Sequence, residues 1–378
     1  MIAAGIGALS CVIWVVMIAA WGRFWRIVTL PEGLKLRTEP PPRVAVVVPA
    51  RNEADVIGQV VKSLLAQDYP GSMRIFVVDD HSTDDTAGAV AQAARDCSDR
   101  VTIISAAPLP AGWTGKMWAL AQGVERAGEY SPEYFLFTDA DIVHAPDSVA
   151  SLVAMAQASN LDMVSMMVQL KCASLAERAL IPAFVYFFFM LYPPAWVNDP
   201  RNKTAAAAGG DILVRAAALA RIGGIATIRG ELIDDCALAR EIKRNGAIWL
   251  GLTRNAWSIR SYEGFSGVGG MISRNAFYQL KHSAWLLMGT VLGLGITFLA
   301  PPVLVFFGGW AALLGGLAWL LMSLSFWPMV RFYGLSPLWA ASLPVVALFY
   351  SGATLHSAVQ YWMGRGGKWK GRAQDARV

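Results

Sequence analysis

The chain has 378 residues, of which 55% are hydrophobic and only 16% are charged. This balance is too apolar for an ordinary soluble enzyme and indicates membrane spans. The net charge is +5, and much of the positive excess lies beside apolar segments, so we interpret it as cytosolic anchors facing anionic lipid and exclude nucleic acid as a partner.

The first expected element is an apolar run at residues 2–21, followed by Arg23 and Arg26. Its length matches the roughly 20 residues that cross a bilayer. A signal peptide is the alternative, but the charges follow the run and no Ala-x-Ala-like cleavage site is evident. We predict a retained transmembrane anchor over residues 1–22 with its N-terminus outside. Pro40-Pro41-Pro42 then ends the linker.

Residues 43–282 are predicted to form an α/β domain. Short β-branched or aromatic runs bounded by turn residues are typical of strands buried on both faces of a parallel sheet. Such runs occur at Val44–Val48, Ile75–Val78, Val101–Ile104 and Phe135–Thr138. Between the first two, Asp55–Gln67 carries apolar residues at helical spacing, which predicts a right-handed strand–helix–strand crossover.

Polar segments follow three of these predicted strands: Pro49–Glu53, Asp79–Asp80 and Asp139–Asp141. In open α/β sheets, ligands bind beyond the carboxyl ends of the strands. The shared placement therefore predicts that the three segments form one site.

Asp139 and Asp141 are the predicted metal ligands of that site. Hard divalent cations such as Mg²⁺ or Mn²⁺ prefer oxygen ligands and commonly keep substrate phosphates in their shell. One carboxylate is expected to bind the metal, while the other contacts ribose or a metal-bound water. The alternative is a simple turn before the helix that Pro146 and Asp147 introduce.

Lys116 follows Gly115 and precedes the helix-like Met117–Val124, so it can approach a diphosphate as a point charge. Further along, Asp234-Asp235 introduces a predicted helix over residues 236–244, with Asn245-Gly246 as a left-handed cap. The alternative for these two carboxylates is helix capping. Gly209-Gly210 is expected to form a tight loop near the sugar.

Two apolar regions bear on the membrane. Leu180–Trp196 is either a buried core helix or an interfacial segment where a lipid acceptor enters. Residues 284–362 contain apolar stretches interrupted by Pro301-Pro302, which permits three spans or two spans plus a re-entrant piece. With two full spans, the basic tail at residues 363–378 would lie in the cytosol, as the positive-inside rule prefers.

Taken in order, four segments resemble the nucleotide-sugar site of inverting family 2 glycosyltransferases: Val46–Glu53, Asp79–Asp84, Thr138–Asp141 and Ile233–Asp235. The resemblance implies a GT-A-like, Rossmann-type nucleotide-sugar domain of the α/β class with flanking transmembrane helices. It also implies an enzyme that takes a sugar from a nucleotide-diphosphate donor.

The resemblance assigns roles residue by residue. Asp80 accepts a hydrogen bond from a uracil-like base, since a carboxylate can only accept. Asp235 is the catalytic base, and Asp234 stands where the family usually has Glu. Inversion needs one base to take the acceptor proton, because the metal-bound diphosphate leaves unprotonated. The other residues that it places at the donor are Pro49, Arg51, Glu53, Asp79 and Lys116.

Two further positions follow from the family pattern. His144 is similar to the histidine after Asp-x-Asp in polyprenyl-phosphate sugar transferases, although a structural role is the alternative. Arg274 matches the arginine of a Gln-x-x-Arg-Trp diphosphate clamp, but Met271 and Asn275 replace the other two residues. This departure argues against a processive polysaccharide synthase.

The subgroup that the chain resembles is the hopene-associated glycosyltransferases of bacteria, through Pro108–Lys116, Met190–Asn198 and Trp369–Arg372. It implies a lipid acceptor such as a hopanoid, and a multi-pass protein of the bacterial inner membrane whose catalytic domain faces the cytosol. The alternatives are a polyprenyl-phosphate, ceramide-like or carotenoid acceptor, a glycan-export partner, and an inactive scaffold.

The four cysteines are widely spaced and form no Cys-x-x-Cys pair, which argues against a zinc site or a disulfide framework and suits a reducing cytosol. They are Cys11, Cys97, Cys172 and Cys236.

Overall fold

A computed structural model describes residues 1–364, 368–369 and 372–373 of the chain. These residues form two compact units. The α/β unit comprises the described residues of Val28–Lys171, Trp196–Arg260 and Lys368–Val378. The helical unit comprises those of Met1–Ile27, Cys172–Ala195 and Ser261–Gly367. Much of the predicted basic tail, and Lys370-Gly371 of the motif noted there, lie outside the described residues.

The α/β unit contains an eight-stranded sheet in the order β3-β2-β1-β4-β7-β6-β8-β5. The strands are β1 (Val44–Ala50), β2 (Met73–Asp79), β3 (Val101–Ser105), β4 (Tyr134–Thr138), β5 (Ile142–His144), β6 (Met163–Gln169), β7 (Asp211–Arg215) and β8 (Ile248–Ser258). The four strands predicted from sequence are β1 to β4, and they pair in parallel. The second half corrects the expectation of a parallel sheet, because β7 is antiparallel to both β4 and β6, and β5 to β8.

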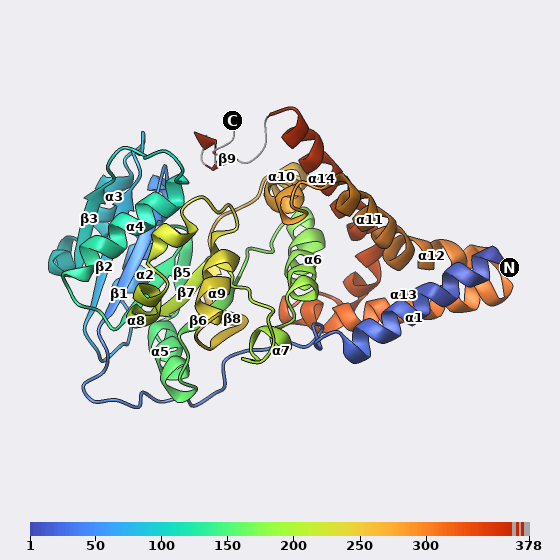
Figure 1. Cartoon of the computed structure of the whole chain (residues 1–378), viewed down its shortest axis with the longest axis horizontal. Helices are drawn as coiled ribbons and strands as arrows, with labels where there is room; N and C mark the ends of the chain where they lie inside the picture. Colours follow the sequence, from blue (N-terminus) through green and yellow to red (C-terminus); the bar gives the residue numbers. More distant parts are fainter. Residues whose placement is uncertain (365–367, 370–371, 374–378) are drawn as a thin grey trace. The chain divides into compact units, whose positions relative to one another are not determined.

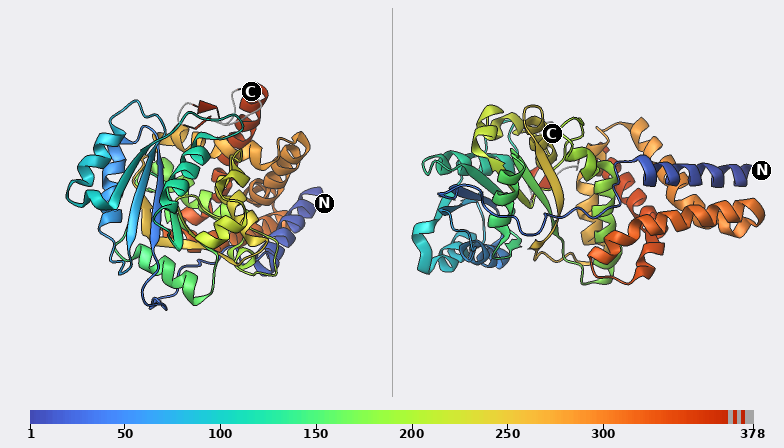
Figure 2. Two further views of the ribbon diagram at one scale, coloured as in Figure 1. Left: turned by 60° about the vertical axis from the view of Figure 1, so that its left-hand side comes forward. Right: turned by 90° about the horizontal axis from the view of Figure 1, so that it is seen from below.

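Helices lie along both sides of these strands (Figures 1 and 2). They are α2 (Ala54–Leu65), α3 (Thr86–Ala93), η1 (Arg95–Arg100), α4 (Gly115–Gly128), α5 (Ser148–Ala158), α8 (Ala216–Arg221), η2 (Ile225–Ile228) and α9 (Asp234–Lys243). The short helix α7 (Pro194–Val197) has residues in both units. The two-residue strands β9 (Lys368–Trp369) and β10 (Arg372–Ala373) pair separately.

Strand β1 is buried along its whole length because a helix covers each of its faces. On one face, Val46 packs in a core cluster with Ile57 and Val61 of α2. On the other, Gly123 brings α4 so close that a Cβ there would lie 2.3 Å from Val47 Cγ1. Burial on both faces explains why β1 reads as an unbroken apolar run rather than an alternating one.

The helical unit consists of α1 (Ile2–Ala20), α6 (Leu175–Leu191), α10 (Gly264–Gln279), α11 (Ala284–Leu294), η3 (Gly295–Leu299), α12 (Ala300–Leu304), η4 (Val305–Phe307), α13 (Gly309–Phe332), η5 (Pro337–Ser342) and α14 (Leu343–Trp362). Among the described residues, four helical segments are long and apolar enough to cross a membrane: Ile2–Ala20, Ala284–Phe307, Gly309–Phe332 and Pro337–Trp362.

The segment Ala284–Phe307 continues through Pro301-Pro302 instead of ending there. A π-turn at η3 precedes the prolines, and Pro301 has no N–H to donate to the carbonyl of Thr297. The N-terminal helix α1 compensates, because Trp14 Nε1 donates to the Thr297 carbonyl at 2.9 Å and Ser10 Oγ to the Ile296 carbonyl at 2.6 Å. Helix α1 runs alongside α13 in both figures.

Helix α6 clarifies the apolar segment Leu180–Trp196. It begins earlier than the prolines suggested, at a capping box formed by Ser174 and Glu177, and Pro182 lies inside it. Tyr186 and Phe189 are fully buried, and Tyr186 donates or accepts a hydrogen bond with Ser325 of α13. The structure therefore favours the buried core helix for this part of the segment.

Candidate functional site

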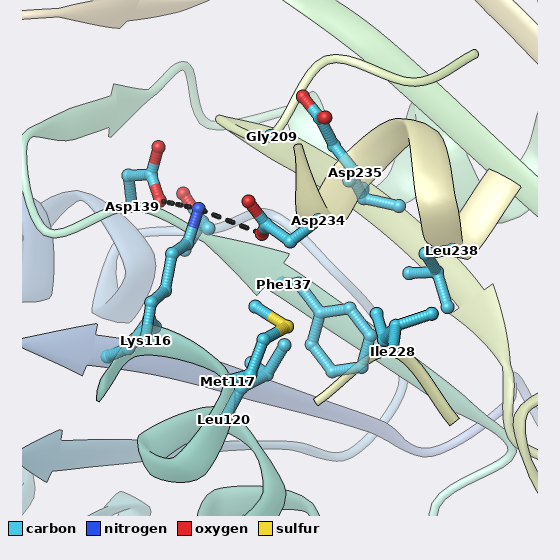
Figure 3. Close-up of a pocket in the computed structure, with 13 residues that line it drawn as sticks. Lys116, Met117, Leu120, Phe137, Asp139, Gly209, Ile228, Asp234, Asp235 and Leu238 are labelled. Atoms are coloured by element: carbon cyan, nitrogen blue, oxygen red, sulfur yellow. Dashed lines mark ion pairs between the residues drawn. The ribbon is translucent and has the colours of Figure 1, made fainter. Parts of the chain in front are cut away.

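A lysine between two aspartates joins three parts of the α/β unit. Thr114 caps the N-terminus of α4 and places Lys116 in its first turn. Lys116 Nζ lies 3.0 Å from Asp139 Oδ1, just beyond β4, and 3.2 Å from Asp234 Oδ2, at the start of α9. Figure 3 shows the ammonium group lying between the two carboxylates. Residues separated by more than a hundred positions in the sequence thus meet at one point.

Charge in this cluster perturbs the titration of its members. Burial alone would lower the pKa of Lys116, but the carboxylates of Asp139 and Asp234 outweigh it, so its pKa is raised. Burial raises the pKa of Asp139, and the nearby Lys116 only partly opposes this. Lys116 is therefore a permanent positive charge at neutral pH.

Asp235 lies beside this cluster, in the first turn of α9. Its Oδ1 accepts a hydrogen bond of 2.7 Å from the Cys236 N–H. Burial, followed by repulsion from Asp234, raises the pKa of Asp235 to about 7. A Cβ on Gly209 would lie 3.4 Å from both Asp235 Oδ2 and Lys116 Nζ, so the Gly209 backbone passes directly beside both groups. A raised pKa suits a general base that operates near neutral pH.

The same residues form the rim of a pocket with an apolar floor (Figure 3). The charged rim comprises Lys116, Asp139, Asp234 and Asp235. The apolar lining comprises Met117, Leu120, Phe137, Ile212, Ile228 and Leu238, and Pro49, Thr138 and Gly209 complete it. A charged rim over an apolar floor is typical of small-molecule sites.

The ends of β1 and β2 place a second group of predicted residues together. Ala50 and Asp79 pair in register, so Arg51 and Asp80 follow neighbouring strand ends. Arg51 Nη1 donates to the Asp80 carbonyl and lies 3.7 Å from its Oδ2. Asp80 is buried, with the partly exposed His81 ring 3.3 Å from its Oδ1. Asp79 accepts a hydrogen bond from the Ser82 N–H.

Asp141 and Glu53 contact a residue that the sequence did not reveal, Arg260. Its Nη2 lies 2.8 and 2.9 Å from the two Glu53 carboxylate oxygens, and its Nε lies 3.2 Å from Asp141 Oδ2. Ser258 Oγ also donates to Asp141 Oδ2, at 2.7 Å. Ser258 ends β8 and Arg260 follows two residues later, a spacing that would place both on one side of an extended chain and is the one sequence signal for this network.

Three other predictions are resolved locally. His144 is buried, its ring lies 3.0 Å from Thr138 Oγ1, and burial lowers its pKa to about 4, so the structural alternative fits it. Helix α9 ends at Lys243, and neither Asn245 nor Gly246 has a positive φ, so the predicted left-handed cap is wrong. Arg274 lies on α10 of the helical unit, and its predicted diphosphate contact stays a prediction.

The donor set at Asp139 and Asp141 fits a hard divalent cation that is completed by substrate. Among the described residues, no three His, Cys, Asp or Glu side chains form a metal-binding group. Mg²⁺-type sites commonly use only one or two carboxylates plus substrate phosphates. Asp139 Oδ2 and Asp141 Oδ1 have no hydrogen-bond or ion-pair partner within the described part of the chain, so each carboxylate keeps an oxygen for a cation.

Comparisons with known proteins identify the family of the chain. A family model described as "Glycosyltransferase like family 2" matches residues 41–250. An N-acetylglucosaminyltransferase of Rhizobium leguminosarum bv. viciae is 35% identical over 118 residues, which cover 31% of this chain and 26% of that protein. A beta-monoglucosyldiacylglycerol synthase of Synechocystis sp. is 45% identical over 56 residues, covering 15% and 12%. The chain thus spans about a quarter or less of these relatives.

The fold is shared with a solved mannosyltransferase, PcManGT from Pyrobaculum calidifontis, in complex with GDP-Man and Mn²⁺. The two structures superpose with a TM-score of 0.60 at 20% identity, over 96% of this chain and 99% of that one. At this identity the likeness establishes the fold alone.

Proposed function

Since this chain belongs to the glycosyltransferase family 2, whose model matches more than half of it, we propose that it is a membrane-bound inverting glycosyltransferase. It transfers a sugar from a nucleotide-diphosphate donor to a lipid hydroxyl. The observation that carries the proposal is the meeting of Lys116, Asp139 and Asp234 beside Asp235, at the carboxyl edge of the sheet. Ligands bind at this edge in open α/β sheets.

Asp235 is the proposed base of the reaction. It takes the proton of the acceptor hydroxyl as that oxygen attacks the anomeric carbon, and the bond to the diphosphate breaks on the opposite face of the sugar. Burial raises its pKa to about 7. A general base is most effective when its pKa lies near the pH at which the enzyme works. Asp234 forms an ion pair of 3.2 Å with Lys116 and so helps to position the Lys116 ammonium group beside Asp235.

Lys116 and the Asp139–Asp141 pair are the proposed diphosphate site. The ammonium of Lys116 is a compact charge that can contact the leaving group. A divalent cation, when held by Asp139 and Asp141, supplies Lewis-acid stabilisation of the departing diphosphate. The similar mannosyltransferase was solved with Mn²⁺, which supports Mn²⁺ as the first metal to try and Mg²⁺ as the second.

The nucleotide base is proposed to lie at the ends of β1 and β2, near Pro49 and Arg51. Asp80 accepts from an imide N–H of the base once the base replaces the neighbouring His81 ring, which is 44% exposed at its side chain. We propose a UDP-sugar as the donor. A guanine nucleotide also carries a suitable donor group, and the similar mannosyltransferase binds GDP-Man, so GDP-sugars belong in the same test.

The acceptor is proposed to be a lipid at the cytosolic leaflet of a bacterial inner membrane. The four apolar helices support membrane attachment, and the packing of α1 on η3 supports its retention as an anchor. One relative of known function is a glycolipid synthase, which supports a lipid as the acceptor. Within that class we propose a hopanoid, on the resemblance to the hopene-associated group.

The test is release of nucleoside diphosphate by the detergent-purified full chain. A panel of UDP- and GDP-sugars is supplied with Mn²⁺ or Mg²⁺, with and without bacterial lipid extract. We expect one donor to give lipid-stimulated, metal-dependent release that Asp235→Asn and Asp139→Ala abolish. Asp68→Asn, an exposed aspartate in the same unit, is the matched control and should leave the rate unchanged.

Single acceptors then resolve the lipid. A hopanoid, a polyprenyl phosphate, a ceramide and a carotenoid alcohol are each added alone, and the product is identified by mass spectrometry. Release from no donor, by folded protein with added lipid, would refute the proposal and favour the export or scaffold alternatives.

A further inference from the structure

Arg260 joins two predicted site residues, Asp141 and Glu53, although it lies outside the sequence motifs. The end of β8 and the two residues after it hold Asp141 at three points. The Ile259 N–H donates to its carbonyl at 3.0 Å, Ser258 Oγ donates to its Oδ2 at 2.7 Å, and Arg260 Nε donates to the same oxygen at 3.2 Å. Both the backbone and one carboxylate oxygen of Asp141 are therefore fixed by residues more than a hundred positions away.

The contacts leave the two oxygens of Asp141 in different situations. Oδ2 accepts two hydrogen bonds, whereas Oδ1 has no partner within the described residues. A carboxylate with one oxygen held twice cannot rotate freely about its Cβ–Cγ bond. Oδ1 is therefore presented in one direction without losing further side-chain entropy when a cation arrives.

Arg260 is in turn held by Glu53. Glu53 is 8% exposed, and both of its carboxylate oxygens lie within 2.9 Å of Arg260 Nη2. A buried carboxylate needs a paired charge of this kind, and a planar guanidinium can serve two carboxylates at once. Glu53 thus lies where it orients Arg260, although the sequence had suggested a place beside the nucleotide.

We propose that Arg260 is a positioning residue that orients Asp141 for a divalent cation, with Glu53 as its anchor and Ser258 as its second support. This inference rests on the proposed function of the site. The network acts through Asp141 and touches no reacting atom.

For the cation affinity of a variant without Arg260, electrostatics and positioning make opposite predictions, so the measured affinity distinguishes them. Removal of the Arg260 charge frees Oδ2 and makes the site more negative, so electrostatics alone predicts tighter binding of a cation. Positioning predicts weaker binding, because partners that orient a ligand typically account for about 10–100-fold in metal affinity.

The experiment titrates Mn²⁺ alone into the full-length, detergent-purified protein and measures free Mn²⁺ by electron paramagnetic resonance. We expect Arg260→Met to weaken Mn²⁺ binding about tenfold or more. Arg260→Lys should also weaken Mn²⁺ binding, since a lysine keeps the positive charge but lacks the planar guanidinium that contacts both carboxylates. Ser258→Ala should weaken it less, without any change of charge.

Arg215→Met is the matched control. Arg215 Nε lies 3.2 Å from Asp162 Oδ1, and its side chain is 31% exposed, compared with 3.2 Å and 34% for Arg260 and Asp141. This pair lies on another part of the sheet, so its loss should leave Mn²⁺ affinity unchanged. Thermal unfolding of each variant identifies any that fail to fold. If Arg260→Met does not fold, the Mn²⁺ affinities of Ser258→Ala and Arg260→Lys test the proposal in its place.

Each outcome bears on the proposal. Unchanged or tighter Mn²⁺ binding in folded Arg260→Met or Arg260→Lys overturns the inference, even when the wild type releases nucleoside diphosphate normally. Weaker binding by these variants supports it, and a wild type that binds Mn²⁺ but turns over no donor then counts against the proposed function alone. A wild type that binds no Mn²⁺ on its own overturns the inference, and the release of nucleoside diphosphate then decides the proposed function separately.

Discussion

Asp211 is the clearest place where the structure predicts a gain of stability from one substitution. It is the first residue of β7, lies opposite Thr138 and is 1% exposed. Neither of its carboxylate oxygens has a hydrogen-bond partner among the described residues. Burial accordingly raises its pKa to about 8. Asp211→Asn keeps the shape of the side chain and removes its ionisable group.

The size of the effect follows from linkage. The pKa of Asp211 is higher in the folded than in the unfolded chain, so the folded state binds more protons between about pH 4 and pH 8. Stability is therefore lost as the pH rises through this window, by up to about 1.4 kcal/mol per pH unit. Over the roughly 3.5 pH units between pH 4 and pH 7.5 this loss amounts to about 5 kcal/mol. An unsatisfied amide still costs about 1–3 kcal/mol, so the net gain of Asp211→Asn at pH 7.5 is about 2–4 kcal/mol.

The assay is thermal unfolding followed by tryptophan fluorescence, from pH 5 to pH 8, in detergent. We expect the melting temperature of Asp211→Asn to exceed that of the wild type by several degrees at pH 7.5. The difference should shrink towards pH 5, because the proton that Asp211 takes up on folding becomes less costly as the pH approaches the pKa of the carboxyl in the unfolded chain. Asp68→Asn, exposed, should show no such trend. A variant less stable than the wild type at pH 7.5 would mean that the carboxylate has a stabilising partner, and the reasoning would be wrong.

Three further predictions concern the site and the helical unit. The wild-type kcat/KM should rise with pH to a plateau above about 7, because Asp235 must be deprotonated to act as the base. Asp235→Asn should lower the rate about 10²–10⁴-fold while donor binding is retained. A flat pH profile would exclude Asp235 as the base. Lys116→Met should weaken binding of the nucleoside diphosphate about tenfold by calorimetry, with partial recovery in Lys116→Arg; equal affinity would contradict a phosphate contact. Trp14→Phe should lower the free energy of unfolding by about 0.6–2 kcal/mol, because the hydrogen bond to the Thr297 carbonyl is lost. The control Trp310→Phe, at an exposed position, should have no such effect. Equal melting temperatures of the two variants would refute a stabilising role for the Trp14 hydrogen bond.

Local sequence patterns determined the first half of the sheet and which strand ends carry the candidate site. Short β-branched runs and one helical repeat are sufficient to define β1, α2 and β2, because periodicity and burial on two faces are encoded in neighbouring residues. The carboxylates at the ends of these strands could be predicted to meet, since parallel strands in one sheet bring their carboxyl ends to the same edge.

The second half of the sheet could not be predicted in this way. Strand β7 begins at Asp211 and runs antiparallel to β4, and nothing in its five residues specifies the direction of its neighbours. A run of apolar residues is compatible with either orientation, and the connecting segments decide between them.

Decisive contacts of the site and of the helical unit lie at large sequence separation. Arg260 pairs with Glu53 across 207 residues, and Trp14 reaches the Thr297 carbonyl across 283. No local pattern marks either partner, because each side chain is ordinary in its own segment. Only the tertiary structure brings them together, since burial makes an unpaired charge or carbonyl costly and so selects the one arrangement in which each finds its partner.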